Sequence, residues 1–166
     1  MRIKFVLLTI LLLAFSSVGF ARAASTPDAI VKDLYAAQKA SSGPFFQTKS
    51  RALVDKYFTK DFADLIWKDA VDAKGEVGAI GFDPLYNAQD TEITAFKIGK
   101  PMYGEGNLDA ADVPVTFRNM GKDETVLFRL ERNSQKIWKI SDIYYPSNPE
   151  SSSSLKDILT AALKAA

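Results

Sequence analysis

The hydrophobic pattern of this chain changes period near residue 90, and no other feature of the sequence limits the fold as strongly. Before that point, apolar residues recur every three or four positions, which is the spacing of amphipathic helices. After it they occupy every second position, which is the spacing of strands with one buried face. Helices that come first and strands that follow predict layered helices and antiparallel strands rather than alternating βα units. The expected fold class is therefore α+β, in a single domain.

Three amphipathic stretches make up the helical half. The first begins at Thr26-Pro27-Asp28, where a hydroxyl cap, a proline at the first helical position and an acid favour a helix start. Its apolar face is expected to comprise Ile30, Val31, Leu34 and Ala37, with Tyr35 at the edge. The second stretch carries Leu53, Val54, Tyr57 and Phe58, and the third, after Thr59, carries Phe62, Leu65, Ile66, Ala70 and Val71.

The alternating half predicts four strands, around residues 94–98, 113–117, 126–130 and 138–140. Their connections are short and rich in turn residues, which favours antiparallel neighbours and a four-stranded meander. Because every second residue is polar, we expect one face of the sheet to be covered, by the early helices. After a polar linker, residues 146–153, Ser154 and Asp157 favour the start of a last helix. Its apolar stripe is expected to pack on the core rather than to bind a partner.

The N-terminus has the three-part pattern of a secretory signal peptide. Arg2 and Lys4 precede an apolar run, and Ala21-Arg22-Ala23 forms an A-x-A cleavage site. The uncharged run is shorter than the roughly 20 residues of a bilayer span, so a membrane anchor is the less favoured interpretation. We expect a signal peptide over residues 1–23 and a mature domain over residues 24–166 without a membrane anchor. The predicted location is periplasmic or secreted, in a bacterium.

The composition excludes several classes of site. The chain has no cysteine, so it forms no disulfide and accepts no lipid at its N-terminus. It has no histidine, which excludes Ser-His-Asp and Cys-His nucleophile systems and, with the lack of cysteine, the usual zinc sites. Cleavage leaves 18 basic and 20 acidic residues, a net charge of −2, without a basic stripe. We therefore predict no cofactor and no nucleic-acid partner.

A 17-residue connection, Lys74 to Asp90, separates the two halves, and connections of this length are often functional. It ends in the segment GFDPLYNAQD, residues 81–90. The interpretation that we favour is architectural: Asp83 caps a short turn that begins at Pro84, and Asp90 ties the loop to the strand that follows.

The alternative for this segment is a calcium site with Asp83, Asn87 and Asp90 as oxygen ligands. The spacing does not fit an EF-hand, which needs glycine at the sixth position and glutamate at the twelfth, where this chain has Ala88 and Thr94. An irregular site stays open as an alternative.

Three segments of the second half, Phe82-Asp83-Pro84-Leu85, Ala88-Gln89-Asp90 and the WKISDI run of residues 138–143, resemble an uncharacterised family of bacterial exported proteins and lipoproteins. That family is a domain of unknown function similar to the cystatin-like superfamily, which includes nuclear transport factor two and ketosteroid isomerase. The resemblance covers Ala29 to Leu163. It implies a curved antiparallel sheet with helices on its concave face and often a cone-shaped pocket, and it implies no activity. The chain lacks the lipid-accepting cysteine of the lipoprotein relatives.

An enzyme on such a fold would gather Asp83, Asp90, Asp142 and Tyr86 or Tyr144 around a pocket. Ketosteroid isomerase transfers protons with Asp and Tyr side chains alone, so a histidine-free isomerase or hydro-lyase is chemically feasible. That chemistry needs one desolvated carboxylate and one preorganised donor, and the spacing does not show that these side chains converge.

Alternation places Asp142 on the same strand face as Trp138 and Ile140, where an acid must find partners. We favour a structural role, in which Asp142 sits near the strand end and accepts backbone N–H groups or pairs with an arginine, over a role in a pocket. The arginines in or beside the neighbouring predicted strands are Arg118, Arg129 and Arg132.

Tyr103, Tyr144 and Tyr145 are candidate interaction residues, because tyrosine combines a large apolar surface with a polar tip. The Tyr144-Tyr145 pair fits an exposed contact and equally fits the rim of the core. The function predicted from the sequence is a non-enzymatic binding or interaction module of the periplasm. A small-ligand carrier that uses a cone-shaped pocket is the alternative, and the isomerase or hydro-lyase is the least favoured.

Overall fold

The computed structural model describes residues 26–40, 42–146 and 154–165. The predicted signal peptide and nearly all of the predicted linker lie outside these residues. The helices are α1 (Pro27–Lys39), α2 (Arg51–Tyr57), α3 (Lys60–Asp72) and α4 (Leu155–Ala165). The strands are β1 (Ile93–Ile98), β2 (Met102–Gly104), β3 (Asn107–Asn119), β4 (Lys122–Arg132) and β5 (Trp138–Tyr144). The chain is an α+β protein, as predicted.

The sheet is an antiparallel meander in the order β1-β3-β4-β5, and β2 is an additional short strand that pairs with β3. The predicted order is therefore confirmed, with one more strand than expected. The pattern did not predict β2 because this strand has only three residues and lies against a glycine-rich turn.

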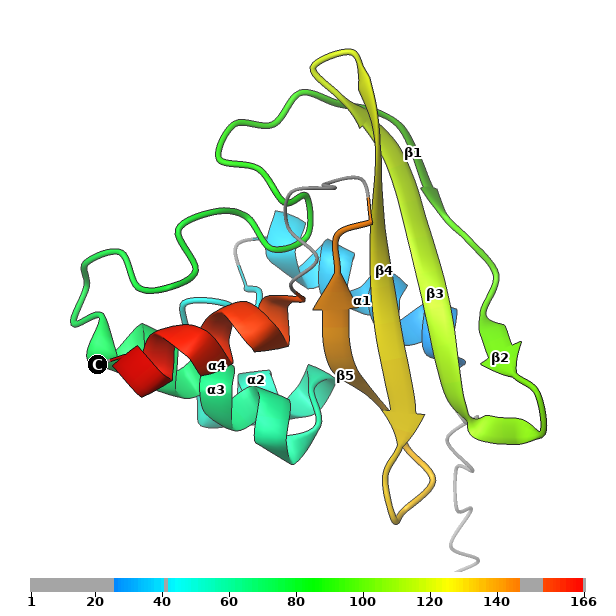
Figure 1. Ribbon diagram of the computed structural model, residues 1–166, viewed down its shortest axis with the longest axis horizontal. Helices are drawn as coiled ribbons and strands as arrows, with labels where there is room; N and C mark the ends of the chain where they lie inside the picture. Colours follow the sequence, from blue (N-terminus) through cyan, green and yellow to red (C-terminus); the bar gives the residue numbers. More distant parts are fainter. Residues whose placement is uncertain (1–25, 41, 147–153, 166) are drawn as a thin grey trace, which may run out of the picture.

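The helices cover one face of this curved sheet (Figure 1). On β3, Val113, Val115 and Phe117 are buried, and their partners on β4 continue the same apolar face. Helix α1 contacts β1, β3 and β5, whereas α2, α3 and α4 contact β5. This arrangement is the one that the resemblance implies. One cluster of buried side chains joins the helices to the sheet.

Two details of the predicted helix faces are wrong. Tyr35 of α1, expected at the edge of the apolar face, is buried in the core, and Val71 of α3, expected on the apolar face, is 43% exposed. The helix start at Thr26 is confirmed, but the Thr26 side chain makes no capping hydrogen bond. The Thr26 backbone carbonyl instead accepts the N–H groups of Ala29 and Ile30.

A β-bulge breaks the predicted alternation of β1. The register shifts between Thr94 and Lys97, and Ala95 takes a left-handed φ of 51°. Thr94 lies opposite Arg118 on the outer face, while Ile98 lies opposite Val115 on the core face. Simple alternation over the predicted strand 94–98 puts Thr94 and Ile98 on one face, and this prediction is wrong, since an extra residue in a strand reverses the facing of everything beyond it.

A second bulge, in β5, corrects the predicted facing of Asp142. The register shifts at Ser141, so that Ile140 pairs with Leu130 and Asp142 pairs with Arg129. Directly opposed residues share a face, and Arg129 is on the outer face. Asp142 is thus not on the face of Ile140, and Ile143 takes the core position instead, where it is fully buried.

Asp142 nevertheless has the structural role that we favoured, at the sheet edge. Its Oδ1 accepts the backbone N–H groups of Ile143 (2.7 Å) and of Lys156 (3.2 Å), in the first turn of α4. The N-cap Ser154 and Asp157 also exchange reciprocal side-chain-to-backbone bonds, as in a capping box. The Lys156 ammonium pairs with Asp61 of α3. These contacts fix α4 to β5 and to α3.

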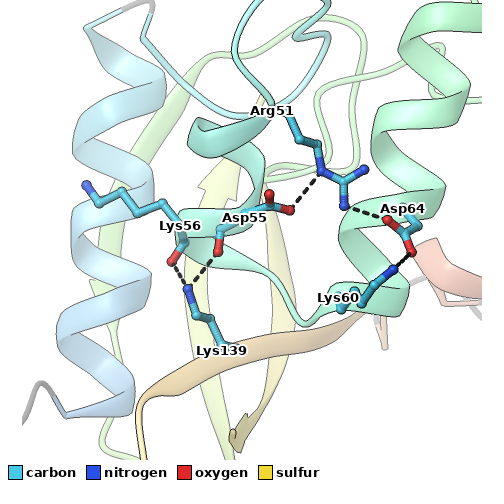
Figure 2. Close-up of polar contacts among 6 residues, drawn as sticks. All are labelled: Arg51, Asp55, Lys56, Lys60, Asp64 and Lys139. Carbon is cyan, nitrogen blue, oxygen red and sulfur yellow. Dashed lines mark hydrogen bonds and ion pairs between the residues drawn. The ribbon is translucent and has the colours of Figure 1, made fainter. Parts of the chain in front are cut away.

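Ion pairs connect α2 and α3, and a lysine of β5 joins the same corner (Figure 2). The Arg51 guanidinium bonds the carboxylates of Asp55 (2.8 Å) and Asp64 (2.6 Å), and Asp64 also accepts Lys60. Lys139 donates to the backbone carbonyls of Asp55 (2.6 Å) and of the next residue (2.7 Å). Carbonyls at the C-terminal end of a helix lack intrahelical partners, so Lys139 supplies the hydrogen bonds that these two carbonyls of α2 would otherwise lack.

No helix within the described residues is long and apolar enough to cross a membrane.

Candidate functional site

The segment predicted to hold the site forms a tight turn. The N–H of Asp83 donates to the Ala88 carbonyl (2.8 Å) and closes the turn through an antiparallel bridge. Asp83 Oδ1 accepts the N–H of Leu85 (2.8 Å). Asn87 takes a left-handed φ of 50°, which asparagine tolerates better than most residues. The side chain of Asp83 therefore supports local backbone geometry, although the segment is a bridged turn and not a helical one.

Two tyrosine hydroxyls attach this turn to the core. Tyr35 of α1 donates to the Leu85 carbonyl (2.7 Å), and Tyr145, just beyond β5, donates to the Pro84 carbonyl (3.1 Å). Leu85 itself is fully buried. The turn is thus held from the helix layer and from the sheet, which makes it a rigid wall for any neighbouring hollow.

Aromatic rings collect beside the turn. The Tyr86 ring packs edge-on against Tyr35 (5.6 Å between centroids) and against Phe117 (5.2 Å). Phe96, 42% exposed beside the β1 bulge, packs against Tyr35 at 4.9 Å. Part of this cluster stays accessible to solvent.

Asp83 is a half-buried carboxylate in largely neutral surroundings. Burial raises its pKa, and the Leu85 N–H opposes that rise. Burial also raises the pKa of the Tyr35, Tyr86 and Tyr145 phenols, and the negative charge of Asp83 raises them further. These phenols therefore remain uncharged at neutral pH. Among the ion pairs of the described residues, none involves Asp83.

A hollow of about 680 Å³, here called the loop hollow, lies on one side of the turn. Its walls come from the ends of α1 and α3, from Phe46, and from the loop between α3 and the turn. Apolar atoms are supplied chiefly by Phe46, Val77, Ile80 and Phe82. The polar lining residues are Gln38, Asp69, Glu76, Asp83 and Gln89.

Two further hollows share Tyr35 and Phe96 in their lining and are together called the helix–strand groove. One, of about 640 Å³, lies beside Asp83 and Tyr86, and the other, of about 370 Å³, is lined by residues of α1 and β1. Asp83 and Gln38 line both the loop hollow and this groove. The Asp83 turn therefore separates two open concave surfaces.

Asp69 shapes the floor of the loop hollow. Its buried carboxylate accepts the N–H groups of Ala79 (2.7 Å) and Ile80 (3.2 Å) and so folds the loop back onto α3. A Cβ atom at Gly78 would lie 2.6–2.9 Å from this carboxylate, so a larger residue cannot occupy position 78 without displacing it. The close approach requires glycine.

The two carboxylate residues among the calcium candidates, Asp83 and Asp90, have different bonding partners. Asp83 uses one oxygen for the Leu85 N–H, whereas Asp90 is exposed and accepts the Asn119 side-chain amide through its backbone carbonyl (3.2 Å). Asp90 thus connects the loop to the sheet through its main chain. Across the described residues, no three Asp, Glu, His or Cys side chains are grouped as metal ligands would be.

The residues of the enzyme hypothesis do not converge. Asp83 and Tyr86 are together at the groove, but Asp90, Asp142 and Tyr144 line neither hollow. Asp142 is engaged by backbone N–H groups at the start of α4, as described above.

The arginines are also paired elsewhere. Arg129 bonds Asp112 through two nitrogens (3.0 and 3.2 Å) and donates to the Tyr144 hydroxyl (3.0 Å). Arg118 pairs with Asp123, and Arg132 pairs with Asp109. Arg129 lies opposite Asp142 across the β4–β5 pair, but its described hydrogen bonds go to Asp112 and Tyr144.

The three candidate interaction tyrosines have different environments. Tyr145 is 4% exposed and belongs to the core, and Tyr144 is half-buried on the outer sheet face. Tyr103 is 46% exposed on β2, with its ring 6.2 Å from that of Trp138. The Tyr144-Tyr145 pair therefore does not form one exposed patch.

Phe46 and Asp69 are among the residues of the loop hollow that sequence reasoning missed, as are Gln38 and Glu76. Asp69 lies outside the apolar stripe predicted for α3, and it is buried because the loop that follows α3 folds back over it. Phe46 is 52% exposed with a left-handed φ of 62°. The adjoining Ser-Ser-Gly-Pro and Phe-Phe run is a signal for an irregular turn that exposes an aromatic ring.

Comparison of the chain with protein-family models, with curated proteins and with solved structures finds no match. The resemblance to the cystatin-like superfamily therefore remains a prediction about ancestry, while the α+β architecture is established by the fold itself.

Proposed function

We propose that this protein is an exported, non-enzymatic binding module that holds a small ligand in the loop hollow. The observation that carries the proposal is the hollow of about 680 Å³, whose volume lies in the range of small-molecule sites. Its walls combine apolar surface with a few carboxyl and amide groups, as such sites do. The rigid attachment of the Asp83 turn by Tyr35 and Tyr145 supports a preformed site.

The side chains that line the loop hollow favour binding over catalysis. Its polar groups are carboxylates and amides, and each carboxylate oxygen of Asp69 already accepts a backbone N–H group. A proton-transfer site needs a donor aimed at a developing oxyanion, and the described lining offers the amides of Gln38 and Gln89 but no tyrosine or lysine.

The test is a thermal-shift screen of the mature chain, residues 24–166, with a library of small organic molecules. A ligand that binds only the folded state raises Tm. Ala73→Trp places an indole in the loop hollow from the end of α3, and Ala36→Trp does the same in the helix–strand groove. We expect a Tm increase that Ala73→Trp abolishes and Ala36→Trp preserves. Compounds that bind both variants equally, or no active compound at all, would contradict the proposal.

A protein partner is a second candidate, supported by the β2–β3 hairpin. Three of its large apolar side chains are exposed, Met102 (52%), Tyr103 (46%) and Leu108 (70%). Exposed apolar residues gathered on one element favour contact with another macromolecule. Affinity capture from a periplasmic extract should then retain a protein with the wild type and lose it with a Tyr103→Ser/Leu108→Ser variant. Equal retention by both would exclude this hairpin as the contact.

A further inference from the structure

The lining of the loop hollow carries charge of one sign only. Three carboxylate residues, Asp69, Glu76 and Asp83, contribute to it, and no lysine or arginine is among the described residues that line it. Lys39 lines the neighbouring groove instead. An anionic ligand would meet three like charges here, so charge complementarity favours a cation.

The three carboxylates differ in the hydrogen bonds and ion pairs that they already make within the protein. Asp69 is buried and accepts two backbone N–H groups. Asp83 accepts one N–H with Oδ1, and no ion pair within the described chain offsets its charge. Glu76 is exposed beside the hollow. A cation in the hollow would therefore find one half-buried and one exposed carboxylate without a positive partner from the lining.

The apolar part of the lining indicates that the cation is organic. Phe46 and Phe82 present aromatic surface, and Val77 is 80% exposed. Aromatic faces attract ammonium groups, and apolar walls favour a hydrocarbon body. A hydrated metal ion would gain nothing from these walls.

We propose that the loop hollow binds a small organic cation, an ammonium group on an apolar body, with Asp83 and Glu76 as its counter-charges and Phe46 as its apolar contact. This inference rests on the proposed function and specifies its ligand class.

The experiment compares three soluble probes that share one body and differ in charge: 4-phenylbutylammonium, 4-phenylbutan-1-ol and 4-phenylbutyrate. Binding to the mature chain is measured by titration calorimetry at low salt and again at about 0.5 M NaCl, where exposed charges are strongly screened. We expect the ammonium probe to bind about fivefold or more tightly than the alcohol, the carboxylate to bind weakest, and salt to reduce the difference.

Matched variants locate the charges. Asp83→Asn keeps an oxygen that can accept the Leu85 N–H, and Glu76→Gln changes an exposed side chain, so both remove charge with little change of shape. Each should weaken the ammonium probe about fivefold and leave the alcohol unchanged. Asp90→Asn is the control, since it removes the same charge nearby from a residue outside the hollow. It should leave all three affinities unchanged.

Two results overturn the inference. If the alcohol or the carboxylate binds as tightly as the ammonium probe, the ligand is not a cation, although a hollow that Ala73→Trp blocks still supports the proposed function. If Asp90→Asn weakens the ammonium probe as much as Asp83→Asn does, the preference comes from the overall field of the protein and not from this hollow. The proposed function fails on a different result: if Ala73→Trp leaves the binding of every probe unchanged, no ligand occupies the loop hollow.

Discussion

At the scale of single residues, two effects act on the Asp83 carboxyl in opposite directions. Its carboxylate organises the turn by accepting the Leu85 N–H, and its partial burial next to neutral phenols makes ionisation costly, which is why its pKa is raised. An architectural role needs only an acceptor for the Leu85 N–H, and a neutral side-chain amide would supply one without the cost of burying a charge. An unpaired carboxylate at the wall of an open hollow is instead what a site for a positive ligand needs.

The architectural part of this role predicts the effect of Asp83→Ala. The variant leaves the Leu85 N–H without its acceptor, and loss of such a cap costs about 1 kcal/mol. We expect the free energy of unfolding from urea titration to fall by that amount at pH 7. Asp90→Ala is the control and should stay within about 0.5 kcal/mol of wild type, because Asp90 contributes its backbone carbonyl, which alanine retains. Equal stability of the two variants would show that the Asp83 side chain does not hold the turn.

At the scale of elements, the alternating pattern predicted the strands well and their facing less well. Val113, Val115 and Phe117 are buried as expected, since β3 is regular where it pairs with β4. The bulges at Ala95 and Ser141 were not predictable, because an extra residue carries no signature in hydrophobicity. For the same reason Asp142 was assigned to the wrong face.

The candidate site was predictable only in its local part. The Asp-Pro pair and the turn chemistry of residues 81–90 indicated a structured turn, and the structure contains one. The loop hollow was not predictable, because it arises where the end of α1 and the Phe46 turn are brought beside α3 and the loop that follows it. Contacts between distant segments leave no periodic signal in one sequence.

The β5 bulge predicts an asymmetry between two single-residue deletions. Removing Ser141 restores simple alternation, so that Ile140, Ile143 and Tyr145 still face the core. Removing Tyr144 moves Tyr145 to an outward position and withdraws its ring and its bond to the Pro84 carbonyl, at a cost of about 3–5 kcal/mol. We expect the Ser141 deletion to remain folded by far-UV and near-UV circular dichroism, with a smaller loss of stability in urea. A Ser141 deletion that is the less stable of the two would show that the bulge itself supports the fold.

The contact between α3 and α4 predicts a pH-dependent stability. Burial acts to raise the pKa of Asp61, but the Lys156 ammonium, together with the Thr59 hydroxyl and the Phe62 N–H, outweighs it and lowers the pKa to about 2, below the ordinary value of 3.8. A carboxyl with a lowered folded pKa stabilises the fold above its unfolded pKa, and this contribution is lost as the pH falls from 3.8 toward 2.

Lys156→Met keeps the apolar length of the side chain and removes its charge. Because the Asp61 side chain is 63% exposed, solvent screens the pair, and the variant should lose less than about 1 kcal/mol at pH 6. Urea titrations at pH 6, 4 and 3 should show this difference shrinking as the pH falls. A difference that stays constant with pH would mean that Lys156 acts through packing and not through its charge on Asp61.

At the scale of the whole molecule, the helices and the sheet share one buried cluster, to which α1, α2, α3 and α4 and all the long strands except β1 contribute buried residues. A chain with one core unfolds as one unit, so we expect a single cooperative transition. The two tryptophans report on separate layers, Trp67 on α3 and Trp138 at the start of β5. Each of the variants Trp67→Phe and Trp138→Phe leaves one tryptophan, whose fluorescence is followed during urea unfolding. In each variant this fluorescence transition should coincide with the far-UV circular dichroism transition. A Trp67 signal that changes at lower urea than the circular dichroism would show that the helical layer can separate from the sheet. That result would also weaken the proposed site, because α1 and α3 both line the loop hollow, which cannot be preformed if the helical layer opens on its own.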